Sequence, residues 1–150
     1  DAVGLLKRMA SDKIMVEICL TSNTGILGVS GIQHPLATYL KYGVPTALAT
    51  DDEGVSRSEM THEYVKAVQE QNISYRQLKT MARNSLQYAF VEGGALWKNV
   101  ERSQLATACA GNYPGAIKVN VRCDAYLDQS PKAKLQWQLE AAFTQFERKH

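Results

Sequence analysis

The stretch that decides the fold is Gly43-Val44-Pro45-Thr46-Ala47-Leu48-Ala49-Thr50-Asp51-Asp52. Its apolar part, from Val44 to Ala49, has the length and composition of a short strand that is buried on both faces, as in a parallel sheet. Pro45 is compatible with the beginning of such a strand, where the missing N–H costs least. The stretch therefore predicts one strand of an α/β fold.

Two adjacent carboxylates, Asp51 and Asp52, follow this strand directly. In α/β barrels the chemistry is placed at the carboxyl ends of the strands. Because side chains alternate along an extended chain, the two should point in different directions and have different roles. One could hold a metal while the other contacts a substrate. The alternative is a solvated loop, or a cap for the next helix.

Composition limits the classes of function. The 150 residues are 45% hydrophobic and 21% charged, which is typical of a globular domain. A net charge of +2 with no basic cluster argues against a nucleic-acid partner, which needs a patch that matches phosphates. No apolar stretch approaches the roughly 20 residues of a membrane span, so we expect no membrane partner either.

Periodicity and turn residues predict the remaining elements. A strand is expected over residues 14–19, turns over 21–25 and 112–115, and a flexible loop over 53–58. The pattern over 116–129 does not decide between a strand and a loop. Helices are expected over residues 2–10, 34–42, 61–71, 74–90, 95–110 and 130–148. The expected inward residues of the last three helices are Leu78, Met81, Leu86 and Phe90, then Leu96, Val100 and Leu105, then Leu135, Leu139, Phe143 and Phe146.

The three cysteines leave the compartment of the protein open. Cys19 lies in the strand over 14–19 and is expected to be a buried small hydrophobe. Cys109 and Cys123 form a disulfide if the protein is exported, and otherwise they are two free thiols. Export is favoured slightly over the cytoplasm. No C-x-x-C pair is present, so a cysteine-ligated zinc is not indicated.

Six motifs follow one another along residues 1–97. They are Val16-Glu17-Ile18-Cys19-Leu20-Thr21-Ser22-Asn23, His34-Pro35, Gly43-Val44-Pro45, Thr50-Asp51-Asp52, Met60-Thr61-His62-Glu63-Tyr64 and Asn84-Ser85-Leu86-Gln87-Tyr88-Ala89-Phe90. In kind and in order they resemble motifs of the adenosine deaminase family of metal-dependent hydrolases. Ala95-Leu96-Trp97 is similar to the growth-factor-like branch of that family. Glu53 stands where the family often has proline.

The resemblance implies an α/β fold that is the C-terminal portion of a (β/α)8 TIM-type barrel, followed by additional C-terminal helices. Residues 1–97 would form the last βα units, and residues 98–150 a mostly helical extension that packs on the barrel. A complete barrel needs about 250 residues. We therefore expect a fragment, beginning at Asp1 rather than at a methionine, that needs the N-terminal half of the same barrel as its partner.

The resemblance also implies a site with one zinc ion. Asp51 matches the aspartate that ligates zinc, and Asp52 matches the carboxyl that contacts the imidazole-ring nitrogen of the purine. Ser22 would line the active site, or else satisfy backbone groups in its turn. His34 and His62 do not match the three ligand histidines, and the proton-shuttling glutamate is not encoded, so these ligands are expected upstream.

The implied activity of the parent protein is hydrolytic deamination of adenosine, or a close purine nucleoside, to inosine and ammonia. The fragment alone is expected to be inactive. One alternative is a non-catalytic growth-factor-like or binding relative that retains the barrel. Another is an amidohydrolase that acts on AMP or a modified adenine.

Overall fold

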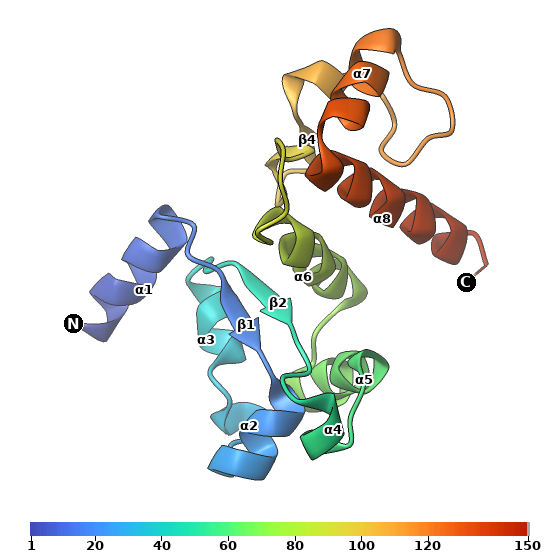
Figure 1. Cartoon of the computed structure of the whole chain (residues 1–150). Helices are drawn as coiled ribbons and strands as arrows, with labels where there is room; N and C mark the ends of the chain where they lie inside the picture. The colour runs from blue at the N-terminus through green and yellow to red at the C-terminus, as the bar shows by residue number, and fades with distance from the viewer. Residues whose placement is uncertain (150) are drawn as a thin grey trace. The chain divides into compact units, whose positions relative to one another are not determined.

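A computed structural model describes residues 1–149, which form an α/β structure composed mostly of helices (Figure 1). The chain divides into two compact units. Unit 1 runs from Asp1 to Ser85, and unit 2 begins at Leu86. The division expected at residues 97 and 98, which follows the reach of the family resemblance, stays a prediction. No helix within residues 1–149 is both long enough and apolar enough to span a membrane.

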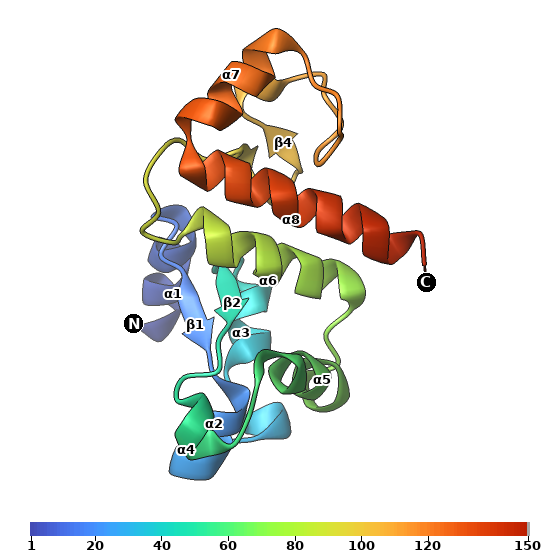
Figure 2. The same cartoon turned by 45° about the vertical axis from the view of Figure 1, so that its right-hand side comes forward.

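Unit 1 is built on two parallel strands, β1 (Val16–Ile18) and β2 (Thr46–Leu48). Val16 lies opposite Thr46, and Ile18 lies opposite Leu48. In both views of the chain, α2 continues from the carboxyl end of β1 and α4 follows that of β2 (Figures 1 and 2). The helices are α1 (Ala2–Ser11), α2 (Leu20–Leu27), α3 (Leu36–Lys41), α4 (Glu53–Ser56), α5 (Met60–Gln71) and α6 (Tyr75–Gln87), with a 3-10 turn at Gly31–Gln33.

The strand predicted over Val44–Ala49 is confirmed. All three residues of β2 are buried, as expected for a strand covered on both faces. Helix α6 begins with a capping box, in which the Ser74 N–H donates to Gln77 Oε1 (2.9 Å) and the Gln77 N–H donates to Ser74 Oγ (3.4 Å). The core of unit 1 consists of Ile18, Leu20, Leu36, Leu48, Ala67, Ile73 and Met81.

Three expectations for residues 21–90 are wrong. The turn predicted over residues 21–25 is part of helix α2, whose first turn is held by a side chain from α5 rather than by local turn chemistry. The loop predicted over 53–58 contains the short helix α4, from Glu53 to Ser56. Helix α6 ends at Gln87 instead of residue 90, and Phe90 is exposed (107%) rather than inward.

Unit 2 contains an antiparallel strand pair where a helix was expected over residues 95–110. Asn99 Oδ1 accepts the Arg102 N–H (2.8 Å), and Ser103 adopts a left-handed conformation (φ 50°), so the chain reverses. The elements of unit 2 are β3 (Trp97–Asn99), β4 (Gln104–Leu105), a 3-10 turn at Thr107–Cys109, α7 (Val121–Gln129) and α8 (Pro131–Glu147).

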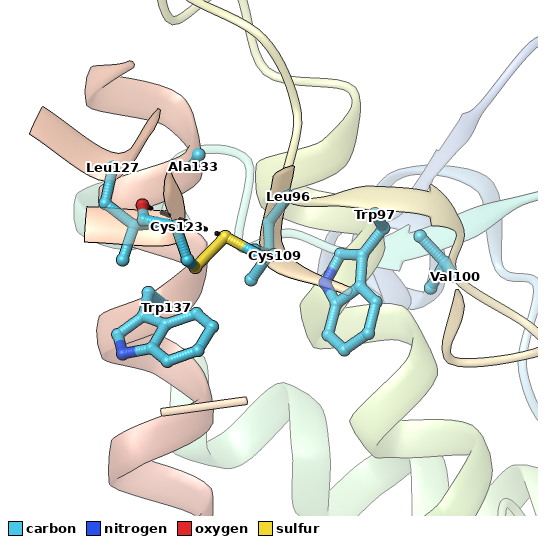
Figure 3. Packing of buried hydrophobic residues seen from close by; sticks show 8 residues of the cluster. All are labelled: Leu96, Trp97, Val100, Cys109, Cys123, Leu127, Ala133 and Trp137. Carbon is cyan, nitrogen blue, oxygen red and sulfur yellow. Dashed lines mark hydrogen bonds between the residues drawn. A yellow bond between two sulfur atoms is a disulfide. The ribbon is translucent and has the colours of Figure 1, made fainter. Parts of the chain in front are cut away.

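A disulfide between Cys109 and Cys123 lies in the core of unit 2 (Figure 3). Both cysteines are fully buried, so of the two alternatives that the sequence left open the bonded one holds. Both tryptophans of the chain, Trp97 and Trp137, belong to the same cluster. The other buried members are Leu96, Val100, Leu127 and Ala133.

Helix α8 begins as predicted, but its buried face differs from the predicted stripe. The side chain of Ser130 accepts the Ala133 N–H (3.2 Å) and caps the helix. Leu135 and Phe146 are exposed (41% and 51%), and the buried face consists instead of Ala133, Gln136, Trp137 and Glu140. Gln136 can be buried because its amide is satisfied, accepting the Leu96 N–H (2.7 Å) and donating to Gln87 Oε1 (2.8 Å).

Candidate functional site

The candidate site lies in unit 1, where β1 and β2 end. Ser22 is in the first turn of α2, directly after β1, and Asp51 lies just beyond β2. The hydroxyl of Ser22 donates a hydrogen bond of 2.7 Å to Asp51 Oδ2. Ser22 is buried, whereas Asp51 is exposed. The structure therefore brings together two of the three residues that the sequence singled out, although they are 29 positions apart.

The backbone turns sharply at the two carboxylates. Asp51 adopts a left-handed conformation (φ 57°), which aspartate tolerates better than most residues. Asp52 returns to an extended conformation and occupies the N-cap position of α4, but its side chain makes no capping hydrogen bond. The alternative role of Asp52 as a helix cap therefore has no hydrogen bond to support it, and its exposed carboxylate faces solvent.

The free thiol of Cys19 lies directly after β1. Burial raises the pKa of Cys19, the carboxylates of Asp51, Glu17 and Glu63 raise it further, and a hydrogen bond with the Asp51 main chain lowers it by less. Cys19 is thus half-buried as a neutral thiol next to Asp51. The exposed carboxylate of Asp51 could offer an oxygen to a cation, whereas that of Glu63 is fully buried and uses both oxygens on the Thr21 N–H.

Glu63 is a residue that the sequence analysis did not single out. It lies in the first turn of α5, is fully buried (0% exposed), and accepts the Thr21 N–H with both carboxylate oxygens at 3.3 Å. One signal could have identified it. Glu63 lies four residues before Ala67, on the inward face of a helix where a charge is unexpected.

The histidines of unit 1 lie at helix ends. His34 is buried, and its Nδ1 accepts the Leu36 N–H (3.1 Å) at the start of α3. His62 is exposed in the first turn of α5. Within residues 1–149 no three His, Cys, Asp or Glu side chains are grouped to hold a metal ion. Asp51 can therefore supply one oxygen ligand, and a complete catalytic metal site, with its usual three protein ligands, requires groups beyond this cluster.

The family model described as Adenosine deaminase matches residues 1–100. Adenosine deaminase from Shewanella loihica is 39% identical to the chain over 88 residues, which cover 58% of this chain and 27% of the relative. The Serratia proteamaculans protein of the same name is 36% identical over 89 residues, covering 59% and 27%. The Salmonella heidelberg adenosine deaminase is 35% identical over 106 residues, covering 70% and 31%.

The matched part of the chain thus spans less than a third of the length of these curated relatives. It includes every residue of the candidate site described above, from Cys19 to Glu63. Because the family model covers two thirds of the sequence, from residue 1 to residue 100 of 150, the chain belongs to the adenosine deaminase family.

Proposed function

We propose that this chain forms the C-terminal part of a (β/α)8 barrel enzyme that deaminates adenosine, or a close purine nucleoside, to inosine and ammonia. The observation that carries the proposal is the hydrogen bond from Ser22 to Asp51. It joins two side chains at the carboxyl ends of adjacent parallel strands, which is where barrel enzymes gather their reacting groups.

Asp51 is proposed to ligate one zinc ion. Its Oδ2 accepts the Ser22 hydroxyl, while Oδ1 accepts no hydrogen bond within the described part of the chain. An exposed carboxylate with one oxygen oriented and the other open fits a metal ligand whose neighbour fixes its rotamer. The remaining ligands are proposed to come from the part of the protein outside this chain.

Zinc, when bound, lowers the pKa of water to about 7 and so makes hydroxide available at neutral pH. The residues of this chain would orient the reactants. Ser22 would hold the carboxylate of Asp51 in one orientation. Asp52, whose carboxylate is exposed, is proposed to contact the imidazole-ring nitrogen of a purine. The left-handed turn at Asp51 lets adjacent residues serve the metal and the substrate separately.

The N-terminal half of the same barrel is proposed as the partner of unit 1. A sheet of two three-residue strands is marginal by itself, and more strands are needed for independent stability. The register directs the main-chain groups of Glu17 away from the β1–β2 pair. This edge of β1 is a place where a further strand would add.

The test is an absorbance assay of adenosine conversion to inosine by the full-length protein, combined with its zinc content. We expect deamination by the wild type. Asp51→Ala should lose both zinc and activity, whereas Asp52→Asn should keep zinc and lose activity. Wild-type zinc content and activity in Asp51→Ala would refute the assignment. Activity on AMP without activity on adenosine would refute the substrate class.

A further inference from the structure

We propose that Glu63 is a positioning residue, which holds the first turn of α2 so that Ser22 meets Asp51. The proposal rests on the function assigned to Asp51 above. It concerns a buried side chain on α5, 41 positions after Ser22 in the chain, that contacts no reacting group itself.

Helix α2 has no cap from its own sequence. The first N–H groups of a helix have no partner within the helix. The N-cap residue of α2 is Cys19, and its side chain makes no capping hydrogen bond. The carboxylate of Glu63 takes that place, with each oxygen 3.3 Å from the Thr21 nitrogen. A carboxylate at this end is also favoured by the helix dipole.

Ser22 is the residue that follows Thr21, so the contact with Glu63 is one residue from the functional hydroxyl. A shift of the first turn of α2 would move Ser22 Oγ away from Asp51 Oδ2, which it now reaches at 2.7 Å. Helix α5 also packs against both α2 and β2. Its position therefore helps to fix where Ser22, at the start of α2, lies relative to the carboxyl end of β2. Glu63 is thus the polar link between α5 and the helix that carries Ser22.

The same carboxylate also holds the segment after the two aspartates. Ser58 Oγ donates to Glu63 Oε1 (3.4 Å) just after α4, where Arg57 is in a left-handed conformation (φ 47°). Glu63 therefore contacts the chain on both sides of the candidate site, at Thr21 and at Ser58. One side chain fixes the helix before the site and the loop after it.

Packing alone does not account for a carboxylate at this position. Glu63 is fully buried and forms no ion pair within residues 1–149. Burying a charge that has no opposite partner is costly, and an apolar side chain would fill the same space at lower cost. Compared with an apolar side chain, the carboxylate adds directed hydrogen bonds, which it accepts from the Thr21 N–H and the Ser58 hydroxyl.

The test uses Glu63→Ala and Glu63→Gln in the full-length protein. Gln keeps an oxygen that can accept the Thr21 N–H, whereas Ala removes it. Glu70→Ala is the matched control, because Glu70 lies on the same helix and pairs with Lys66 (2.7 Å). Zinc affinity is measured by chelator competition at a temperature where every variant is folded, and amide exchange is measured at Thr21 and Ser22.

We expect Glu63→Ala to weaken zinc binding about 10- to 100-fold, the usual effect of removing a group that orients a metal ligand. It should also lower kcat more than it raises KM, and speed amide exchange at Thr21 and Ser22. Glu63→Gln should restore most of each, and Glu70→Ala should match the wild type. Glu63→Ala with a lower melting temperature but wild-type zinc affinity and amide exchange would overturn the proposal.

The two proposals fail in different ways. If Asp51→Ala binds zinc as tightly as the wild type, the function assigned to Asp51 fails. Glu63 is then judged by amide exchange alone, and unchanged exchange at Thr21 and Ser22 in Glu63→Ala overturns its positioning role.

Discussion

The side-chain amide of Asn84 donates a hydrogen bond of 2.9 Å to the main-chain carbonyl of Thr46. Both residues are buried, and the bond ties α6 to strand β2. In the parallel register, the main-chain N–H and C=O of Ala47 face β1. The carbonyl of the preceding residue, Thr46, therefore faces the other edge of β2. Asn84 thus satisfies a buried carbonyl that no other strand within residues 1–149 reaches.

Replacing Asn84 with alanine should therefore destabilise unit 1. The change leaves the Thr46 carbonyl unsatisfied, at a cost of about 1–3 kcal/mol. Urea unfolding followed by far-UV circular dichroism measures the loss. Ser85→Ala is the control, because Ser85 is exposed and its hydroxyl donates to the Ala82 carbonyl (2.8 Å) within the same helix. Equal midpoints for the two variants would contradict a structural role for Asn84.

If Asp51 ligates zinc as proposed, Ser22→Ala in the full-length protein should weaken metal retention and activity together. The change frees Asp51 Oδ2 from its 2.7 Å hydrogen bond, and loss of such an orienting contact costs about 10- to 100-fold. Zinc content after dialysis and kcat/KM measure the two effects. Ser30→Ala is a matched control, because Ser30 makes no side-chain capping bond at its 3-10 turn. Full activity in Ser22→Ala would leave the observed hydrogen bond without a function.

Strand β2, which precedes Asp51, could be predicted from the sequence, because a short apolar run depends on local residues alone. The same is true of the capping box at Ser74 and the N-cap at Ser130. The Ser22–Asp51 pair could be expected only through family resemblance. A hydrogen bond between residues 29 positions apart depends on how β1 and β2 align, which periodicity does not encode.

The failures share one cause, which is that tertiary contacts overrode local signals. Thr21-Ser22-Asn23-Thr24-Gly25 reads as a turn, yet it is helical because Glu63 caps it from another helix. Residues 95–110 have a helical apolar pattern, yet Trp97 and Leu105 pair across two strands. Gln136 reads as a surface residue and is buried because Leu96 and Gln87 satisfy its amide.

Unit 1 should lose stability as the pH falls below about 6.5, because of His34. Burial lowers the pKa of His34, and its Nδ1 must stay unprotonated to accept the Leu36 N–H. The unfolded chain therefore takes up this proton at a higher pH than the folded chain does. The contribution of neutral His34 to stability is complete above the pKa of the unfolded chain, about 6.5, and is lost as the pH falls toward the lower pKa of the folded chain. The slope approaches about 1.4 kcal/mol per pH unit at most.

His34→Asn tests this dependence, because an asparagine oxygen can accept the Leu36 N–H without titrating. Urea unfolding at pH 7.5 and 5.5 should show a smaller loss in the variant than in the wild type. His62, which is exposed, remains in both proteins as an internal control. Identical pH dependence in the two proteins would mean that His34 does not control it.

Reducing the Cys109–Cys123 bond should destabilise unit 2. The bond closes a loop with a sequence separation of 14 inside a buried cluster, and loss of such a bond costs about 2–5 kcal/mol. Both tryptophans lie in that cluster, so tryptophan fluorescence during denaturation reports on unit 2. We expect a lower midpoint for Cys109→Ala, and no change for Cys19→Ala, whose thiol belongs to unit 1. An unchanged midpoint in Cys109→Ala would show that apolar packing alone holds this core.

Gly115→Ala should destabilise unit 2 more than Gly111→Ala does. Both glycines have a positive φ (77° and 81°), so an alanine costs about 1–2 kcal/mol of backbone strain at either position. They differ in space, because a Cβ at Gly115 would collide with the Ala141 main chain in α8, whereas one at Gly111 meets nothing within 4 Å. The difference between the two variants therefore isolates the close approach of this loop to α8, and overpacking adds about 1–3 kcal/mol. Tryptophan fluorescence in urea measures both losses. Equal midpoints would mean that the loop moves aside and that α8 does not depend on this contact.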